Sequence, residues 1–178
     1  KLEGSFDPAE DFGVVLEGEG WHPGVIGIVA SRIAERVHRP TVLIAVADGQ
    51  GRGSARSIPG FDLLAALHAC REHLGRFGGH RAAAGMDIAS DRIAGFRAAF
   101  NAEVRARLAG EQPCPVLRPQ LEISLAAVTQ RLAHLLSYLG PFGVGNPAPV
   151  FLARQVDLPR PAREVGKGHL KLQITESG

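Results

Sequence analysis

Hydrophobic positions in the first 110 residues recur with periods that predict strands alternating with helices. Residues 13–20 and 42–47 are short apolar runs typical of strands. Residues 23–38 between them place apolar side chains three and four positions apart, as in a helix, with Pro23 in the first turn. The side of this helix predicted to face the sheet carries Ile26, Val29, Ile33 and Val37. Strand, helix and strand in this order predict at least one parallel pair.

Two further helices and another strand complete this region. One helix begins at about Asp62, and the other follows a capping signal at Ser90 and Asp91. The alanine-rich residues 81–88 between them predict a buried strand. Apolar positions at helical spacing define the two packing faces: Leu63, Leu67, Cys70, Leu74, Ile93, Phe96, Phe100, Val104 and Leu108. The predicted fold class is α/β, a mixed β-sheet flanked by helices.

The pattern loses its period over residues 111–120, where prolines accumulate. We therefore predict a linker there, between a first domain of residues 1–110, which opens with an acidic lead at residues 1–12, and a second of residues 121–178. The second domain has one helical segment at 129–140 and three strand candidates at 121–125, 151–156 and 169–175. A β-rich domain with so few strands has not closed. We expect a partial domain and a chain that is a piece of something longer.

Charge is distributed unevenly along the chain. Residues 1–20 contain one lysine and six acidic residues, which gives a local charge of −5. Residues 52–81 contain five arginines and two acidic residues, which gives a local charge of +3. The planar fork of arginine suits bidentate contacts to phosphate. The basic stretch therefore predicts an anionic partner, and a solvated basic surface is the alternative.

Cysteine and apolar content predict the compartment. Cys70 and Cys114 form neither a disulfide framework nor a paired metal-ligand spacing. No apolar run approaches the roughly 20 residues that span a bilayer, and no leader pattern opens the chain. We expect a cytoplasmic protein without a membrane partner.

The first candidate for chemistry is the segment Ser54-Ala55-Arg56-Ser57, which glycines flank on both sides. Two hydroxyl groups and a guanidinium on a glycine-rich loop can grip a phosphate together. A polar surface loop without a ligand is the alternative.

The second candidate is the turn Gly78-Gly79-His80-Arg81, one helix further along the chain. Glycines let a backbone approach a phosphate closely, and an imidazole can donate or accept a proton there. In the alternative, a glycine merely caps the preceding helix. Strand-helix-strand geometry would bring both segments to the same edge of the sheet.

The third candidate is Trp21-His22-Pro23-Gly24, at a predicted helix N-terminus where backbone N–H groups favour an anion. Trp21 is more typical of a packing anchor than of a base-stacking residue, and His22 can also cap the helix. The sequence lacks Asp-x-Asp, Asp-His-His and GxxxxGK[ST] motifs and has no acid–histidine cluster at ligand spacing. Phosphate-gripping residues are thus present without a metal centre.

These motifs resemble a known family. The chain resembles the DHH-associated domain of RecJ-type DHH phosphoesterases in three segments: GWHPGVIGIVASRIAERVHRPTVLIAV, SARSIPGFDLLAAL and LGRFGGHRAAAGM. It also resembles the start of the oligonucleotide-binding (OB) domain of RecJ-type single-strand exonucleases in two later segments, LSYLGPFGVGNPAPVF and GKGHLKLQI. The resemblance covers nearly the whole chain.

The resemblance implies 5′-to-3′ hydrolysis of single-stranded DNA in a cleft between this domain and a DHH domain that holds manganese or magnesium. His80 would reach the scissile phosphate as an auxiliary catalytic residue, and Ser54 and Arg56 would receive the terminal 5′-phosphate. Residues expected to complete the phosphate contacts are Ser57, Gly78, Gly79, Arg81 and His22. The partners implied are single-stranded DNA, the DHH domain and, as a further candidate, a single-strand-binding protein. The OB domain would track the strand beyond the cleft.

The chain departs from the family because the metal-binding half is absent, so we expect no metal and no nuclease activity in this fragment. Three alternatives stay open. One is a small DHH phosphoesterase acting on short oligonucleotides or nucleoside bisphosphates, which normally lacks the OB-like tail. The others are non-catalytic binding modules, either like that of alanyl-tRNA synthetases or like a replication scaffold related to RecJ.

Overall fold

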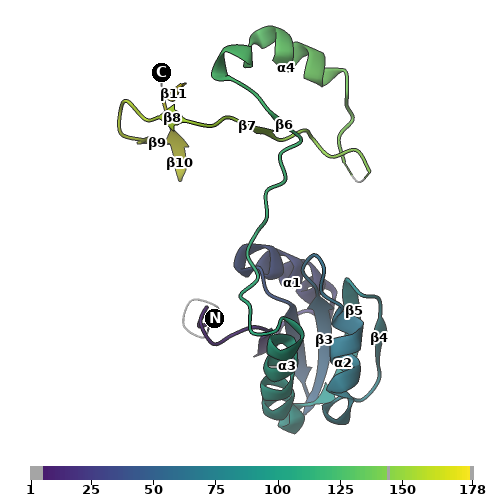
Figure 1. The fold of residues 1–178 in the computed structure, drawn as a ribbon. Coiled ribbons are helices and arrows are strands. Elements are labelled where there is room, and N and C mark those ends of the chain that lie inside the picture. Colours follow the sequence, from purple (N-terminus) through teal and green to yellow (C-terminus); the bar gives the residue numbers. More distant parts are fainter. Residues whose placement is uncertain (1–5, 144, 177–178) are drawn as a thin grey trace. The chain divides into compact units, whose positions relative to one another are not determined.

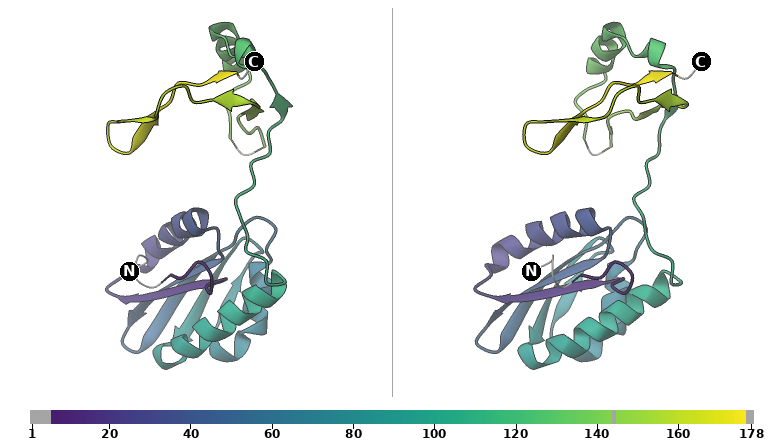
Figure 2. Two further views of the ribbon diagram at one scale, coloured as in Figure 1. Left: turned by 60° about the vertical axis from the view of Figure 1, so that its left-hand side comes forward. Right: turned by 90° about the vertical axis from the view of Figure 1, so that its left-hand side faces the viewer.

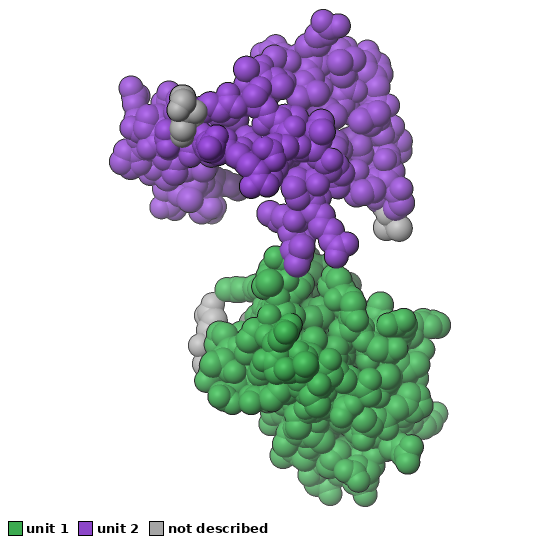
Figure 3. Space-filling view, in the orientation of Figure 1, with its two compact units in different colours: residues 1–115 green, residues 116–178 purple. Residues whose placement is uncertain are grey.

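The computed structural model describes residues 6–143 and 145–176, and the chain divides into two compact units, residues 1–115 and 116–178 (Figure 3). The predicted acidic lead begins in residues 1–5, which lie outside the described residues. Unit 1 is a mixed α/β structure whose elements are β1 (Val14–Glu19), α1 (Pro23–Val37), β2 (Thr41–Ala47), β3 (Gln50–Arg56), α2 (Leu63–Ala69), β4 (Phe77–Gly79), β5 (Ala83–Ala89) and α3 (Ile93–Arg107) (Figure 1).

The sheet of unit 1 has five strands in the order β1-β2-β3-β5-β4. The pair β1–β2 is parallel, as the strand-helix-strand pattern predicts, and the other three pairs are antiparallel. The predicted mixed sheet flanked by helices is confirmed.

Helices cover the two faces of this sheet separately (Figure 2). α2 and α3 pack on one face, where their predicted apolar positions, apart from the partly buried Leu108, are buried together with Val42, Ile44, Met86 and Ile88 of the strands. Asp62 caps α2 as expected, accepting a hydrogen bond from the Ala65 N–H at 3.0 Å. The predicted Ser90–Asp91 cap is wrong, because Ser90–Arg92 form a 3₁₀ turn and no side chain caps α3.

Helix α1 packs on the other face through a stripe that agrees only in part with the prediction, because Ile26 is buried and Ile33 packs partly buried against the same cluster. Its buried residues are Ile26, Ala30 and Ala34, whereas Val29 is 39% exposed. The small alanines let the helix axis come close to Leu43 and Ala45 of β2.

The arginine–serine segment forms strand β3, so its prediction as a loop is wrong. Asp48 (φ 50°) and Gly49 (φ 75°) make a two-residue turn that pairs β3 with β2 as a hairpin. Asp-Gly is a favoured sequence for this turn because both positions need positive φ.

Glycines make β3 a strand that can be covered closely on one face. A methyl group on Gly51 would lie 2.6 Å from Ile44 Cγ2 and 2.9 Å from Ile88 Cγ2, and one on Gly53 would lie 2.6 Å from Met86 Cγ. These glycines are therefore packing positions, not part of a phosphate loop.

The second glycine segment also differs from its prediction. Gly78 and Gly79 lie in edge strand β4 and pair with Gly85 and Ala84 of β5. The turn begins after them, where the His80 N–H donates to the Ala83 carbonyl at 2.8 Å. Gly79 is required there because its φ is 151° and a Cβ would collide with the Ala83 carbonyl oxygen.

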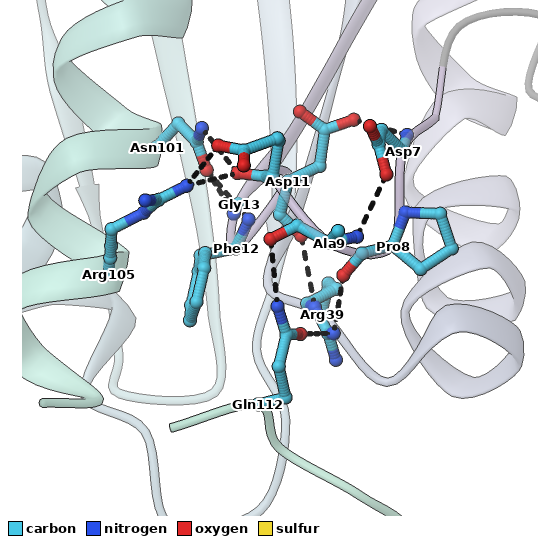
Figure 4. A network of polar contacts seen from close by, with 11 residues as sticks. Asp7, Pro8, Ala9, Asp11, Phe12, Gly13, Arg39, Asn101, Arg105 and Gln112 are labelled. Atoms are coloured by element: carbon cyan, nitrogen blue, oxygen red, sulfur yellow. Dashed lines mark hydrogen bonds and ion pairs between the residues drawn. The ribbon is translucent and has the colours of Figure 1, made fainter. Parts of the chain in front are cut away.

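A buried arginine ties both ends of unit 1 to its centre (Figure 4). Arg39, only 5% exposed, lies between α1 and β2 and donates to the carbonyls of Asp11 (3.0 Å), His38 (3.1 Å) and Pro113 (2.9 Å), and to the Gln112 side chain. Burial lowers the pKa of its guanidinium but leaves it charged at any physiological pH.

α3 anchors the same N-terminal segment from the opposite side. The Asn101 side-chain oxygen accepts from the N–H groups of Phe12 (2.7 Å) and Gly13 (3.0 Å). Arg105 pairs with Glu10 at 2.8 Å and lies over the Phe12 ring, 4.6 Å from its centroid. The described part of the acidic lead is thus held against the domain.

Unit 2 is built from short pieces. Its helix α4 (Gln130–Ser137) is capped by Thr129, and its strands are β6 (Leu121–Glu122), β7 (Phe151–Leu152), β8 (Val156–Asp157), β9 (Arg163–Val165), β10 (His169–Lys171) and β11 (Thr175–Glu176). Each predicted strand is thus shorter or broken in two. None of the described residues of 116–178 is buried, and Leu135 and Leu139 are more than half exposed. Within the described parts of both units, no helix is long and apolar enough to cross a membrane.

We predict that Gly51→Ala destabilises the chain by about 1–3 kcal/mol, because the added methyl group forces Ile44 and Ile88 out of position. Urea unfolding followed by circular dichroism measures the change. Gly85→Ala is the matched control, since its methyl group would meet only the Gly53 carbonyl oxygen at 3.8 Å. Equal stability of the two variants would contradict this packing role.

We predict that Arg39→Ala lowers the free energy of unfolding by roughly 2–4 kcal/mol, because several partly buried carbonyl groups lose their donor and the buried side chain leaves a cavity. It should also speed cleavage by proteinase K, which has little sequence preference, near residues 7–12 and 112–115. Arg92→Ala removes an arginine that makes one exposed hydrogen bond, to the Glu72 carbonyl, and is the control. Unchanged cleavage in the Arg39 variant would show that the arginine does not hold these segments.

Candidate functional site

Ser54 and Arg56 lie on the same side of β3, two residues apart. The Arg56 Nη1 group donates to Ser54 Oγ at 3.0 Å and to the Ala55 carbonyl at 2.8 Å. Both side chains are half-buried. The strand alternates Gly51, Gly53 and Ala55 toward the core, so Arg52, Ser54 and Arg56 share the opposite face.

Gly27 of α1 makes room for this pair. A methyl group there would lie 2.8 Å from Arg56 Nη2 and 3.1 Å from Ser54 Oγ. The helix therefore borders the guanidinium and the hydroxyl closely and restricts where they can move. The result is a cation and a hydroxyl group held side by side, an arrangement that suits one phosphate.

The structure brings the Gly-Gly-His segment to the same end of the sheet, as the chain order predicts. Arg56 pairs with Ala83, and the Ser57 N–H donates to the Ala82 carbonyl at 2.9 Å. The turn that carries His80 and Arg81 therefore adjoins the end of β3.

The predicted residues of this end have different surroundings. His80 is exposed. Arg81 is 76% exposed and pairs with Asp62 at 3.2 Å. The Ser57 hydroxyl donates to the Phe61 carbonyl at 2.9 Å and stabilises the loop before α2. His80 and Arg81 therefore present their side chains to solvent, while Ser57 already has an intramolecular acceptor.

His22 is not brought to these residues. It caps α1, where its Nδ1 accepts from the Gly24 N–H at 3.0 Å, and α1 starts beyond the opposite end of the sheet, where β1 ends. In the described part of the chain no hydrogen bond or ion pair joins it to Ser54, Arg56 or His80. Trp21 beside it packs over Gly18 of β1, which fits the packing anchor and not an exposed stacking platform.

Two arginines near the pair were missed by the sequence analysis. Arg52 is exposed on the same face of β3 and lies opposite Asp87 of β5. Arg76 binds the Asp87 carboxylate through Nε (3.1 Å) and Nη2 (3.0 Å). The alternation Gly-Arg-Gly-Ser-Ala-Arg has a period of two, and this signal could have shown that Arg52, Ser54 and Arg56 share a face.

Neither a metal nor a reactive thiol is favoured by these surroundings. Among residues 6–143 and 145–176, no group of three or more His, Cys, Asp or Glu side chains could hold a metal ion. Burial raises the pKa of the Cys70 thiol to about 11, so this cysteine stays protonated and is a poor nucleophile. The chemistry of the site therefore rests on arginine, hydroxyl, imidazole and backbone groups.

Comparison with known proteins places the chain in a family. Residues 10–106, more than half of the chain, match the DHHA1 domain. The chain belongs to the DHHA1 domain family. Its second unit also matches, with residues 120–178 corresponding to the RecJ OB domain. In the DHHA1 domain of this chain, the matched residues include Ser54, Arg56 and the Gly-Gly-His segment.

Relatives with both parts are bacterial proteins named single-stranded-DNA-specific exonuclease RecJ. The chain is 36% identical to the Bacillus subtilis protein over 165 residues, covering 90% of the chain and 21% of that protein. It is 36% identical to the Escherichia coli protein over 192 residues, covering all of the chain and 31% of that protein. The chain thus spans about a fifth to a third of the length of these relatives.

A solved structure supports the same assignment of fold. The chain superposes on the crystal structure of RecJ in complex with Mg²⁺ from Thermus thermophilus with a TM-score of 0.80 and 33% sequence identity. The match covers 97% of this chain and 26% of that one. The DHHA1 fold followed by an OB-type unit is therefore shared with RecJ.

Proposed function

We propose that this chain is the substrate-binding part of a RecJ-type 5′-to-3′ single-stranded-DNA exonuclease. The observation that carries the proposal is the Ser54–Arg56 pair, held side by side on β3 against Gly27 and adjoining the His80 turn. Similarity to proteins named as single-stranded-DNA-specific exonucleases supports it.

In this proposal the pair receives the terminal 5′-phosphate. A guanidinium supplies charge and a fork of donors, and a serine hydroxyl adds one more donor. A terminal phosphate ester carries more negative charge than an internal one and gains more from a fixed cation. The pair would therefore select the 5′ end of a strand.

The neighbouring turn would form the wall next to the scissile phosphate. His80 would approach that phosphate as an auxiliary catalytic residue, while Gly78 and Gly79 keep the backbone accessible. Arg81 and Ser57 would add contacts at this end of the sheet, and His22 a more distant one at the start of α1.

The metal chemistry would belong to a DHH domain elsewhere in the parent protein. There, manganese or magnesium would activate water and stabilise the leaving oxygen. The described residues of this chain do not offer such a ligand set, so no step of the reaction is assigned to a metal held here. The partners in this proposal are single-stranded DNA, the DHH domain and a single-strand-binding protein, and the compartment is the cytoplasm.

The proposal divides the chain by role. Residues 1–110 would act as the DHH-associated domain, residues 111–120 as a linker, and residues 121–178 as the unit that tracks the strand. The match of residues 120–178 to the RecJ OB domain favours this over a small DHH phosphoesterase or a synthetase-like module, for which no OB-type tail is expected.

We predict that Arg56→Ala removes the preference for phosphorylated strands. Affinity for a 5′-phosphorylated hexathymidylate should fall about tenfold, because one charge-assisted contact is lost, while affinity for the unphosphorylated strand changes little. Fluorescence anisotropy at low salt measures both. Arg92→Ala removes the same charge from the α2 and α3 side of the sheet and controls for net charge. Equal losses for the two oligonucleotides would reject the assignment of Arg56 to the 5′-phosphate.

We also predict that the purified chain releases no mononucleotides from single-stranded DNA when manganese is added, because the proposed metal ligands belong to another domain. Release from a 5′-labelled oligonucleotide can be followed on denaturing gels. Activity that copurifies with the chain and disappears in the His80→Ala variant would contradict the division of roles.

A further inference from the structure

An open groove lies beside the Ser54–Arg56 pair, on the same face of the sheet. It crosses β3, β5 and β4 and has a volume of about 320 Å³. Its lining includes Arg52, Arg76, Gly78, Gly85 and Asp87. α1 reaches this face only as far as β3, so Gly78 and Gly85 remain exposed.

The floor of the groove is backbone. Gly78 and Gly85 pair across β4 and β5 with no side chain between them. A methyl group on Gly78 would meet nothing within 4 Å, and one on Gly85 would meet only a carbonyl oxygen at 3.8 Å. Neither has a positive φ. Gly51 and Gly79 are required by packing and by backbone geometry, but neither requirement explains a glycine at position 78 or 85. Glycine also weakens a strand, so its presence at these two positions calls for another explanation.

Arginines border this floor. Arg52 is exposed, and among the described residues its side chain has no hydrogen-bond or ion-pair partner. Arg76, 93% exposed, is oriented by its two bonds to Asp87. With one carboxylate against two guanidinium groups, the groove keeps a net positive charge and one unengaged arginine fork.

The groove is continuous with the proposed 5′-phosphate site. Ser54 pairs with Gly85, which in turn pairs with Gly78, so the three positions form one row across the sheet. Neighbouring strands lie about 4.8 Å apart, and the floor therefore begins one strand away from the Ser54 hydroxyl.

We propose that this groove binds the nucleotide that follows the 5′-terminal one in a single strand. Its flat base lies on the backbone of Gly78 and Gly85, where any side chain would hold the ring away, and the phosphate on its 3′ side meets Arg52. Asp87 orients Arg76 and does not contact phosphate. This inference rests on the proposed function, because the strand enters from the Ser54–Arg56 pair.

The test uses Gly78→Val and Gly85→Val in the 178-residue chain, with melting temperature and binding to hexathymidylate, with and without a 5′-phosphate, as the readouts. Valine suits a strand, so the melting temperature should stay equal or rise. Affinity for both oligonucleotides should fall at least tenfold, and the ratio between them should stay as in the unmodified chain. Arg52→Ala should weaken both more than the charge-matched Arg92→Ala.

The outcomes separate the two proposals. If the Val variants bind like the unmodified chain, the proposal that the groove binds a nucleotide is wrong. Loss of phosphate preference in Arg56→Ala would still support the proposed function. A lowered melting temperature in the Val variants would also overturn the inference, because the glycines would then have a structural role. Absence of binding by the unmodified chain would instead reject the proposed function itself.

Discussion

The close packing of β3 against its neighbours is the constraint on which the rest of unit 1 depends. Gly51 and Gly53 leave no side chain on one face, so Ile44, Met86 and Ile88 of the adjacent strands can close over that face. A sheet joined through β3 in this way buries its apolar residues under α2 and α3. The opposite face is then left to Arg52, Ser54 and Arg56, and one strand supplies both core and site.

Arg39 sets where the chain enters and leaves this unit. Its guanidinium donates hydrogen bonds to carbonyl groups of the segment before β1 and of the residues after α3. Such a buried charge is tolerated only when its donors are satisfied, which makes the positions of these segments mutually dependent. The linker therefore begins from a defined point on unit 1.

The proposed binding face combines groups that differ in mobility. Ser54 and Arg56 are restricted by α1, whereas His80, Arg81 and Arg52 are exposed and can adapt to a ligand. Under the proposed function, the restricted pair would contact the terminal phosphate and the exposed cations would adjust to the rest of the strand.

Much of unit 1 could be predicted from local pattern. The parallel β1–β2 pair, the start of α2 and the buried faces of α2 and α3 follow from hydrophobic period, and the proximity of Ser54, Arg56 and the His80 turn follows from chain order. The strand character of residues 50–56 was missed, although Asp48-Gly49 and the period of two were visible signals. Unit 2 was predicted less well, since its described residues bury nothing that would hold long strands.

The sequence by itself determined the α/β class, the candidate residues proposed to bind phosphate and the resemblance to RecJ, because these depend on local periodicity and on motifs. Only the tertiary structure decided what each glycine does. Gly51 and Gly53 admit neighbouring side chains, Gly27 admits Arg56, Gly79 permits a backbone angle, and Gly78 lies open. A glycine has no side chain to signal its role, so that role depends on which atoms the fold brings next to it.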